Sequence, residues 1–135
     1  MIRVLIVEDE PLIAEAHQAY LGRLQGFSVA AVAHTARDAM RAASEAAADG
    51  AAIDLVLLDI GLPEVDGYEL ARQLRRLDPP DAPRTLVAVT GYGRAADKEK
   101  ALEAGFDTHL VKPLPLERVR HLVLGGASSQ TPQTS

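Results

Sequence analysis

The sequence IDLVLLD (residues 53–59) decides the fold class of this chain. It is an almost entirely apolar run that ends on a carboxylate, Asp59. A short run of Val, Leu and Ile without polar alternation is typical of a strand that is buried on both faces of a parallel sheet. Comparable runs occupy residues 2–7, 27–33, 85–89 and 108–111. We therefore predict five strands.

Helical patterns separate these strands. Apolar residues recur at helical spacing over residues 12–24, and Pro11 suits the first turn of that helix. Thr35 and Asp38 resemble a capping box in front of an Ala-rich segment, residues 36–48. Three more helices are predicted over about residues 66–77, 95–104 and 115–124. Strands that alternate with helices predict an α/β domain, with a parallel sheet and helices on both faces.

Composition excludes several classes of protein. With 135 residues and no cysteine, the chain is one domain's worth of sequence without disulfides, cysteine zinc sites or thiol nucleophiles. A net charge of −5, 4% aromatic residues and no Trp argue against direct nucleic-acid binding. Neither a membrane span nor a signal-peptide pattern is present, which predicts a cytoplasmic protein without membrane contact. We place the domain at residues 1–124 and a disordered polar tail or linker at 125–135.

Polar residues follow four of the five predicted strands. Glu8 and Asp9 follow the first strand, Asp59 ends the third, Thr90 the fourth and Lys112 the fifth. Each alone has an ordinary explanation, since acids often cap the next helix and Thr or Lys-Pro is common at strand ends. The carboxyl ends of parallel strands meet at one edge, however, and ligands bind there where the strand order reverses. Together they therefore indicate a functional site.

The residue types at this edge favour phosphoryl transfer with a divalent cation. Clustered carboxylates repel one another without a cation, and Mg²⁺ prefers oxygen ligands. A carboxylate is also a nucleophile that forms an acyl phosphate. Lys112 and Thr90 supply the positive charge and the hydrogen bond that phosphoryl oxygens require.

Four motifs in this order resemble the receiver domain of two-component response regulators. They are VLIVEDE (residues 4–10), LLDIGLPEVDG (57–67), VTG (89–91) and VKP (111–113). The resemblance covers about residues 2–123. It implies a flavodoxin-like fold with strand order 2-1-3-4-5, and a domain that catalyses its own phosphorylation and dephosphorylation without being an enzyme in the usual sense.

The resemblance also implies a role for each site residue. Asp59 is the expected phosphoacceptor, and Glu8, Asp9 and Asp59 are expected to hold Mg²⁺ together with the backbone carbonyl of Gly61. Lys112 is expected to contact the acyl phosphate, with a cis peptide bond before the proline that follows it.

Two residues are expected to switch on phosphorylation. By the same resemblance, Thr90 is the switch hydroxyl and His109 a ring that rotates inward. An ordinary half-exposed strand position is the alternative for His109. His34 lies in loop context without a phosphotransfer signature. The surface that changes is expected to comprise the fourth helix, the fifth strand and the fifth helix.

The expected partners are a sensor histidine kinase or a histidine phosphotransfer protein, with a homodimer through the fourth-helix to fifth-helix face as a further possibility. One alternative is a receiver that acts as an interaction module without phosphorylation. A phosphatase of the haloacid-dehalogenase type is a remote alternative, because such enzymes carry a second Asp two residues after the nucleophile, where this chain has Gly61. A stand-alone receiver, an excised fragment and a chimera joined within residues 52–59 all remain open.

Overall fold

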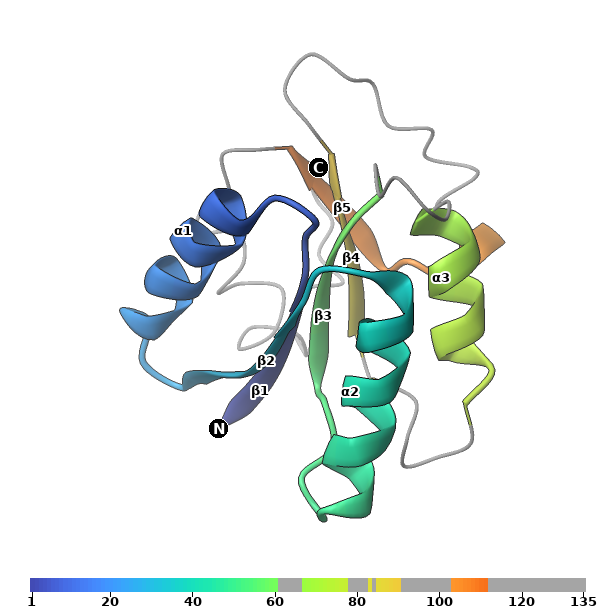
Figure 1. Cartoon of the computed structure of the whole chain (residues 1–135), viewed down its shortest axis with the longest axis horizontal. Coiled ribbons are helices and arrows are strands. Elements are labelled where there is room, and N and C mark those ends of the chain that lie inside the picture. Colours follow the sequence, from blue (N-terminus) through green and yellow to red (C-terminus); the bar gives the residue numbers. More distant parts are fainter. Residues whose placement is uncertain (61–66, 78–82, 84, 91–102, 112–135) are drawn as a thin grey trace, which may run out of the picture.

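The computed structural model describes residues 1–60, 67–77, 83, 85–90 and 103–111. Strands and helices alternate along this part of the chain (Figure 1). In order, the elements are β1 (Ile2–Val7), α1 (Pro11–Gly22), β2 (Phe27–Ala33), α2 (Ala36–Ala48), β3 (Leu55–Asp59), α3 (Gly67–Arg75), β4 (Thr85–Thr90) and β5 (Thr108–Val111). The predicted helix over 95–104 lies mostly outside the described residues, and the helix from 115 and the tail lie wholly outside them.

The five strands form one parallel sheet in the order β2-β1-β3-β4-β5. The predicted flavodoxin-like arrangement is therefore confirmed. The chain moves from β1 outward to β2, and then returns past β1 to β3. The strand order thus reverses between β1 and β3, and a ligand site in this kind of sheet is expected beyond the carboxyl ends of these two strands.

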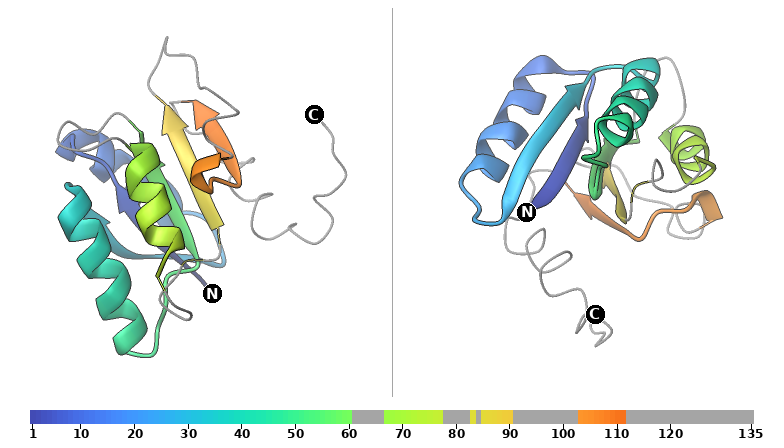
Figure 2. Two further views of the ribbon diagram at one scale, coloured as in Figure 1. Left: turned by 90° about the vertical axis from the view of Figure 1, so that its right-hand side faces the viewer. Right: turned by 90° about the horizontal axis from the view of Figure 1, so that it is seen from below.

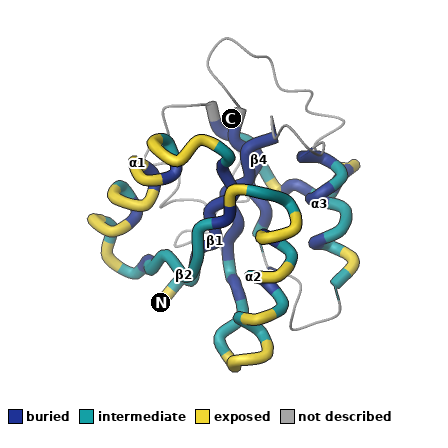
Figure 3. The backbone as a smooth tube through the Cα atoms, in the orientation of Figure 1, coloured by how far each residue is buried: buried dark blue, intermediate teal, exposed yellow. Residues whose placement is uncertain are grey.

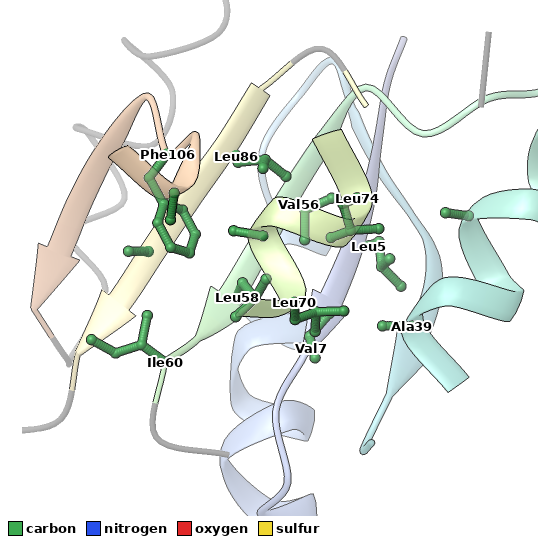
Figure 4. Close-up of a cluster of buried hydrophobic side chains, with 14 of the residues drawn as sticks. Leu5, Val7, Ala39, Val56, Leu58, Ile60, Leu70, Leu74, Leu86 and Phe106 are labelled. Carbon is green, nitrogen blue, oxygen red and sulfur yellow. The ribbon is translucent and has the colours of Figure 1, made fainter. Parts of the chain in front are cut away.

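Apolar side chains project from both faces of the sheet and are packed on both, which explains why the strands do not alternate apolar and polar residues. Successive side chains of a strand point to opposite faces. Leu5, Val56 and Leu58 belong to the cluster that packs under α2 and α3, where Leu70 and Leu74 of α3 meet them (Figure 4). The other cluster lies under α1 and comprises Val4, Ile6, Leu21, Phe27, Leu55, Leu57, Val87, Val89 and Leu110.

The helices cover both faces of the sheet, as predicted. α1 lies on one side, and α2 and α3 lie on the other (Figures 1 and 2). β3 and most of β1 are buried and the edge strand β2 is mostly half-buried, whereas the outward turns of α1 and α2 are exposed (Figure 3). Among the described residues, no helix combines the length and apolar character needed to cross a membrane.

Local sequence signals determine the ends of several elements. Thr35 precedes α2, and its side-chain oxygen accepts a hydrogen bond from the Asp38 amide at 3.1 Å. Gly105 has a φ of 106°, a left-handed conformation that favours glycine, and ends the helical turn at residues 103–104. α1 ends two residues before the predicted Leu24, because the Leu24 amide forms a tighter turn by donating to the Leu21 carbonyl.

Hydrogen bonds also join the elements at the amino ends of β4 and β5. The Arg75 guanidinium, at the end of α3, donates to the Gly105 carbonyl at 2.8 Å, to the Pro83 carbonyl at 3.3 Å and to the Asp107 carboxylate at 2.6 Å. The same carboxylate oxygen of Asp107 accepts from the Leu86 amide of β4 at 2.8 Å. This network, called the amino-edge clamp below, connects α3, β4 and the turn before β5.

Candidate functional site

Strand pairing places the predicted acidic residues beside one another. β1 and β3 pair so that Val7 lies opposite Leu58, and the next residue of each strand segment is Glu8 and Asp59. Asp59 is also paired with Val89 of β4, so it lies inside the sheet rather than at its margin. Both carboxylates therefore emerge at the edge where the strand order reverses.

Glu8, Asp9 and Asp59 form an acidic cluster. Each offers one carboxylate oxygen, and these three oxygens lie within 4.8 Å of one another. Glu8 is 1% exposed and Asp59 8% exposed, while Asp9 is half-buried. Carboxylate oxygens at this spacing are the donor set that a hard divalent cation such as Mg²⁺ takes, with water in its remaining positions. The residues present thus fit the predicted cation.

The electrostatics of the cluster also favour a cation. Two negative charges at 4.8 Å, the upper limit of the separations here, repel by about 3.5 kcal/mol at an effective dielectric constant near 20. Three carboxylates create three such pairs, and the burial of Glu8 and Asp59 limits screening by water. Binding of a divalent cation replaces this repulsion with attraction.

Backbone contacts hold the turn that carries Glu8. The Glu8 amide donates to the Ala33 carbonyl at the end of β2, at 2.9 Å. The Glu8 carbonyl lies 2.8 Å from Nδ1 of His34. The Glu10 amide donates to the Glu8 carboxylate at 3.3 Å. The contact from His34 was not predicted, although its position directly after β2, the neighbour of β1, was a signal that it lies near this turn.

Ile60 and Gly67, on either side of residues 61–66, approach each other closely. The Ile60 amide donates to the Val89 carbonyl at 3.2 Å, and the Gly67 amide approaches the Ile60 carbonyl at 3.4 Å. A Cβ atom on Gly67 would lie 2.4 Å from Cα of Ile60, so only glycine allows this approach. Gly67 therefore determines how residue 60, next to Asp59, is positioned.

The remaining predicted site residues are placed only in part. Thr90 is the last residue of β4, at the same edge of the sheet as the cluster, and nothing further is described of its side chain. His109 is half-buried on β5, in register with Ala88. Gly61 and Lys112, and with Lys112 the predicted cis bond, lie outside the described residues.

Comparison with known families agrees with this geometry. The profile of the response regulator receiver domain family matches residues 4–124. The chain belongs to this family. As a receiver domain it is a signalling domain rather than a classical enzyme, and domains of this kind typically partner with histidine kinases.

Known relatives of this receiver domain include both regulators and kinases. The transcriptional regulatory protein AruR of Pseudomonas aeruginosa is 40% identical over 112 residues, which are 83% of this chain and 43% of AruR. The sensor histidine kinase RcsC of Salmonella typhi is 32% identical over 117 residues, which are 87% of this chain and 11% of RcsC. The chain thus spans less than half the length of either relative.

A solved structure of similar size shows the same fold. The CheY-like receiver domain from Methylobacillus flagellatus is 30% identical, with a TM-score of 0.74. The match covers 93% of this chain and 98% of that one. The two chains are thus compared over nearly their whole lengths.

Proposed function

We propose that this receiver domain accepts a phosphoryl group on Asp59 from the phosphohistidine of a sensor histidine kinase or a histidine phosphotransfer protein, in the presence of Mg²⁺. The observation that carries the proposal is the convergence of three carboxylates within 4.8 Å at the edge where the strand order reverses. Family membership supports the signalling role.

In the proposed reaction, a carboxylate oxygen of Asp59 attacks the phosphorus atom. The new O–P bond forms as the N–P bond to the donor imidazole breaks, and the electron pair of that bond stays on the imidazole nitrogen. Glu8, Asp9, Asp59 and the Gly61 carbonyl are the proposed cation ligands. When bound, the cation supplies positive charge that offsets the charges of the carboxylates and of the phosphoryl oxygens.

Phosphorylation is proposed to act as a switch through charge. It adds about −1.5 to −2 charges to an edge that already carries three carboxylates. Thr90 is the last residue of β4 and Lys112 comes directly after the adjacent strand β5, and we assign them the hydrogen bond and the positive charge for the phosphoryl oxygens. His109 is proposed to turn inward as Thr90 moves. A complete reversal of a two-state population, from 1:99 to 99:1, requires about 5.5 kcal/mol of differential stabilisation.

Phosphorylation by a small-molecule donor tests the proposal without knowledge of the kinase. The wild-type protein is incubated with acetyl phosphate and Mg²⁺, and its intact mass is recorded. We expect the intact mass to increase by one phosphoryl group. In a parallel incubation with EDTA in place of Mg²⁺, we expect no increase.

Two variants make this test specific. Asp59→Asn is expected to remain unmodified, because the amide is not a nucleophile. Asp49→Asn removes an exposed carboxylate at the end of α2 and is expected to be modified like the wild type. Modification of Asp59→Asn to the same extent as the wild type would refute the assignment of Asp59. Absence of any modification or Mg²⁺ response in the wild type would favour a phosphorylation-independent interaction module.

A further inference from the structure

Ala33, the last residue of β2, and His34, which follows it, hold the backbone on both sides of Glu8. The Ala33 carbonyl accepts from the Glu8 amide at 2.9 Å, and the His34 ring meets the Glu8 carbonyl at 2.8 Å. These two contacts engage the peptide group before Glu8 and the peptide group after it. The orientation of the peptide that joins Glu8 to Asp9 is thus set partly by a side chain, that of His34.

The chemistry of this contact identifies the donor. A carbonyl oxygen only accepts, so Nδ1 of His34 carries the proton. Nδ1 bears a proton both in this neutral tautomer and in the charged ring. The contact therefore does not require a particular charge on His34.

The position of Asp9 depends on this peptide. Within the described residues, no side-chain hydrogen bond orients the Asp9 carboxylate, and Asp9 is half-buried. By contrast, the Glu8 carboxylate is buried and accepts from the Glu10 amide at 3.3 Å. A tilt of the peptide after Glu8 would move Asp9 relative to Glu8 and Asp59, and would open the 4.8 Å cluster.

We propose that His34 is a positioning residue for the divalent-cation site. It holds the peptide between Glu8 and Asp9 so that the Asp9 carboxylate converges with those of Glu8 and Asp59. It acts through the backbone, since its Nδ1 contacts the Glu8 carbonyl, and it is not one of the three residues whose ligand atoms converge within 4.8 Å. This inference rests on the cation site of the proposed function.

Three substitutions separate the hydrogen bond from the bulk of the ring. His34→Ala removes the donor. His34→Asn retains an N–H donor bonded to Cγ, which is where Nδ1 lies in histidine. His34→Gln keeps a polar side chain but places its donor one bond further out. Because the His34 residue is exposed, all three variants are expected to fold with a thermal midpoint close to that of the wild type.

The measurement is cation affinity without any phosphodonor. Mn²⁺ is titrated into the full chain and free Mn²⁺ is followed by electron paramagnetic resonance, with Mg²⁺ as a competitor. The Kd of His34→Ala is expected to rise about three- to tenfold, the equivalent of one lost hydrogen bond. His34→Asn is expected to stay within about twofold of the wild type, and His34→Gln to resemble His34→Ala.

The possible outcomes distinguish this inference from the proposed function. If wild type and His34→Ala bind Mn²⁺ equally, or if the Ala and Asn variants weaken binding to the same degree, His34 does not position the site. Neither result bears on the proposal that Asp59 is phosphorylated. If the wild type binds no Mn²⁺ or Mg²⁺, the cation site itself is refuted, and the role of His34 with it. The inference is supported if His34→Ala binds Mn²⁺ more weakly than the wild type and His34→Asn binds it as tightly, both at an unchanged thermal midpoint.

Discussion

Gly67→Ala tests whether the close approach of Gly67 to Ile60 controls the acidic site. The added Cβ would lie 2.4 Å from Cα and 3.0 Å from Cβ of Ile60, whereas ordinary contacts begin at 3.4 Å. Either Ile60 or the start of α3 must therefore move by about 1 Å. Ile60 is joined to Asp59 and donates to the Val89 carbonyl, so its displacement strains the end of β3.

The expected cost follows from the contact that must be relieved. The clash involves backbone atoms rather than the flexible end of a side chain, and overpacking of this kind costs about 1–3 kcal/mol of unfolding free energy. A misplacement of about 1 Å near reacting atoms lowers a rate by up to about 100-fold. We expect a lower urea midpoint and acetyl phosphate labelling that is at least about tenfold slower.

Gly22→Ala is the matched control. Gly22 is the last residue of α1, and a Cβ placed on it meets nothing within 4 Å. In a helix this substitution is neutral or stabilises by up to about 1 kcal/mol, and it should leave labelling unchanged. The reasoning is wrong if Gly67→Ala equals the wild type in both urea midpoint and labelling rate.

Two further predictions concern charge and helix capping. Asp59→Asn removes one member of each of two repelling carboxylate pairs, so in EDTA its free energy of unfolding should be higher than that of the wild type. The rise in thermal midpoint that Mg²⁺ gives the wild type should be largely lost in this variant. A less stable Asp59→Asn protein in EDTA would contradict the repulsion inferred for the cluster. Thr35→Ala should lower the free energy of unfolding in urea by about 1 kcal/mol, because the Asp38 amide loses its acceptor, whereas Thr35→Ser should lower it less. Equal losses in both variants would show that the hydroxyl is not what stabilises α2.

Much of the fold was predictable because its signals are local. Residues 2–7, 27–33 and 36–48 form β1, β2 and α2 with the predicted bounds, since apolar runs and Thr35 act within a few residues of themselves. β3 begins at Leu55 rather than at Ile53. The side-chain carboxylate of Asp54 accepts a hydrogen bond from the backbone amide of Arg3, and the backbone amide of Asp54 donates to the Arg3 carbonyl. These contacts replace regular pairing at the start of the strand.

The candidate site was predictable only as far as strand ends could place it. Glu8, Asp9 and Asp59 converge because parallel strands bring their carboxyl ends together, and their sequence positions already indicated this. The contact of His34 with Glu8 and the approach of Gly67 to Ile60 depend on distances between segments that are not neighbours in sequence. Composition and periodicity contain no information about such distances.

The amino-edge clamp has a consequence for protein engineering. Arg75 and Asp107 join α3 to the starts of β4 and β5, at the end of the sheet opposite the acidic cluster. Its described contacts lie at the amino edge, away from the acidic cluster. Exchange of the sequence directly after β3 or β4 between related domains, as a route to new signalling specificities, should retain Arg75, Gly105 and Asp107 of the recipient as a common scaffold.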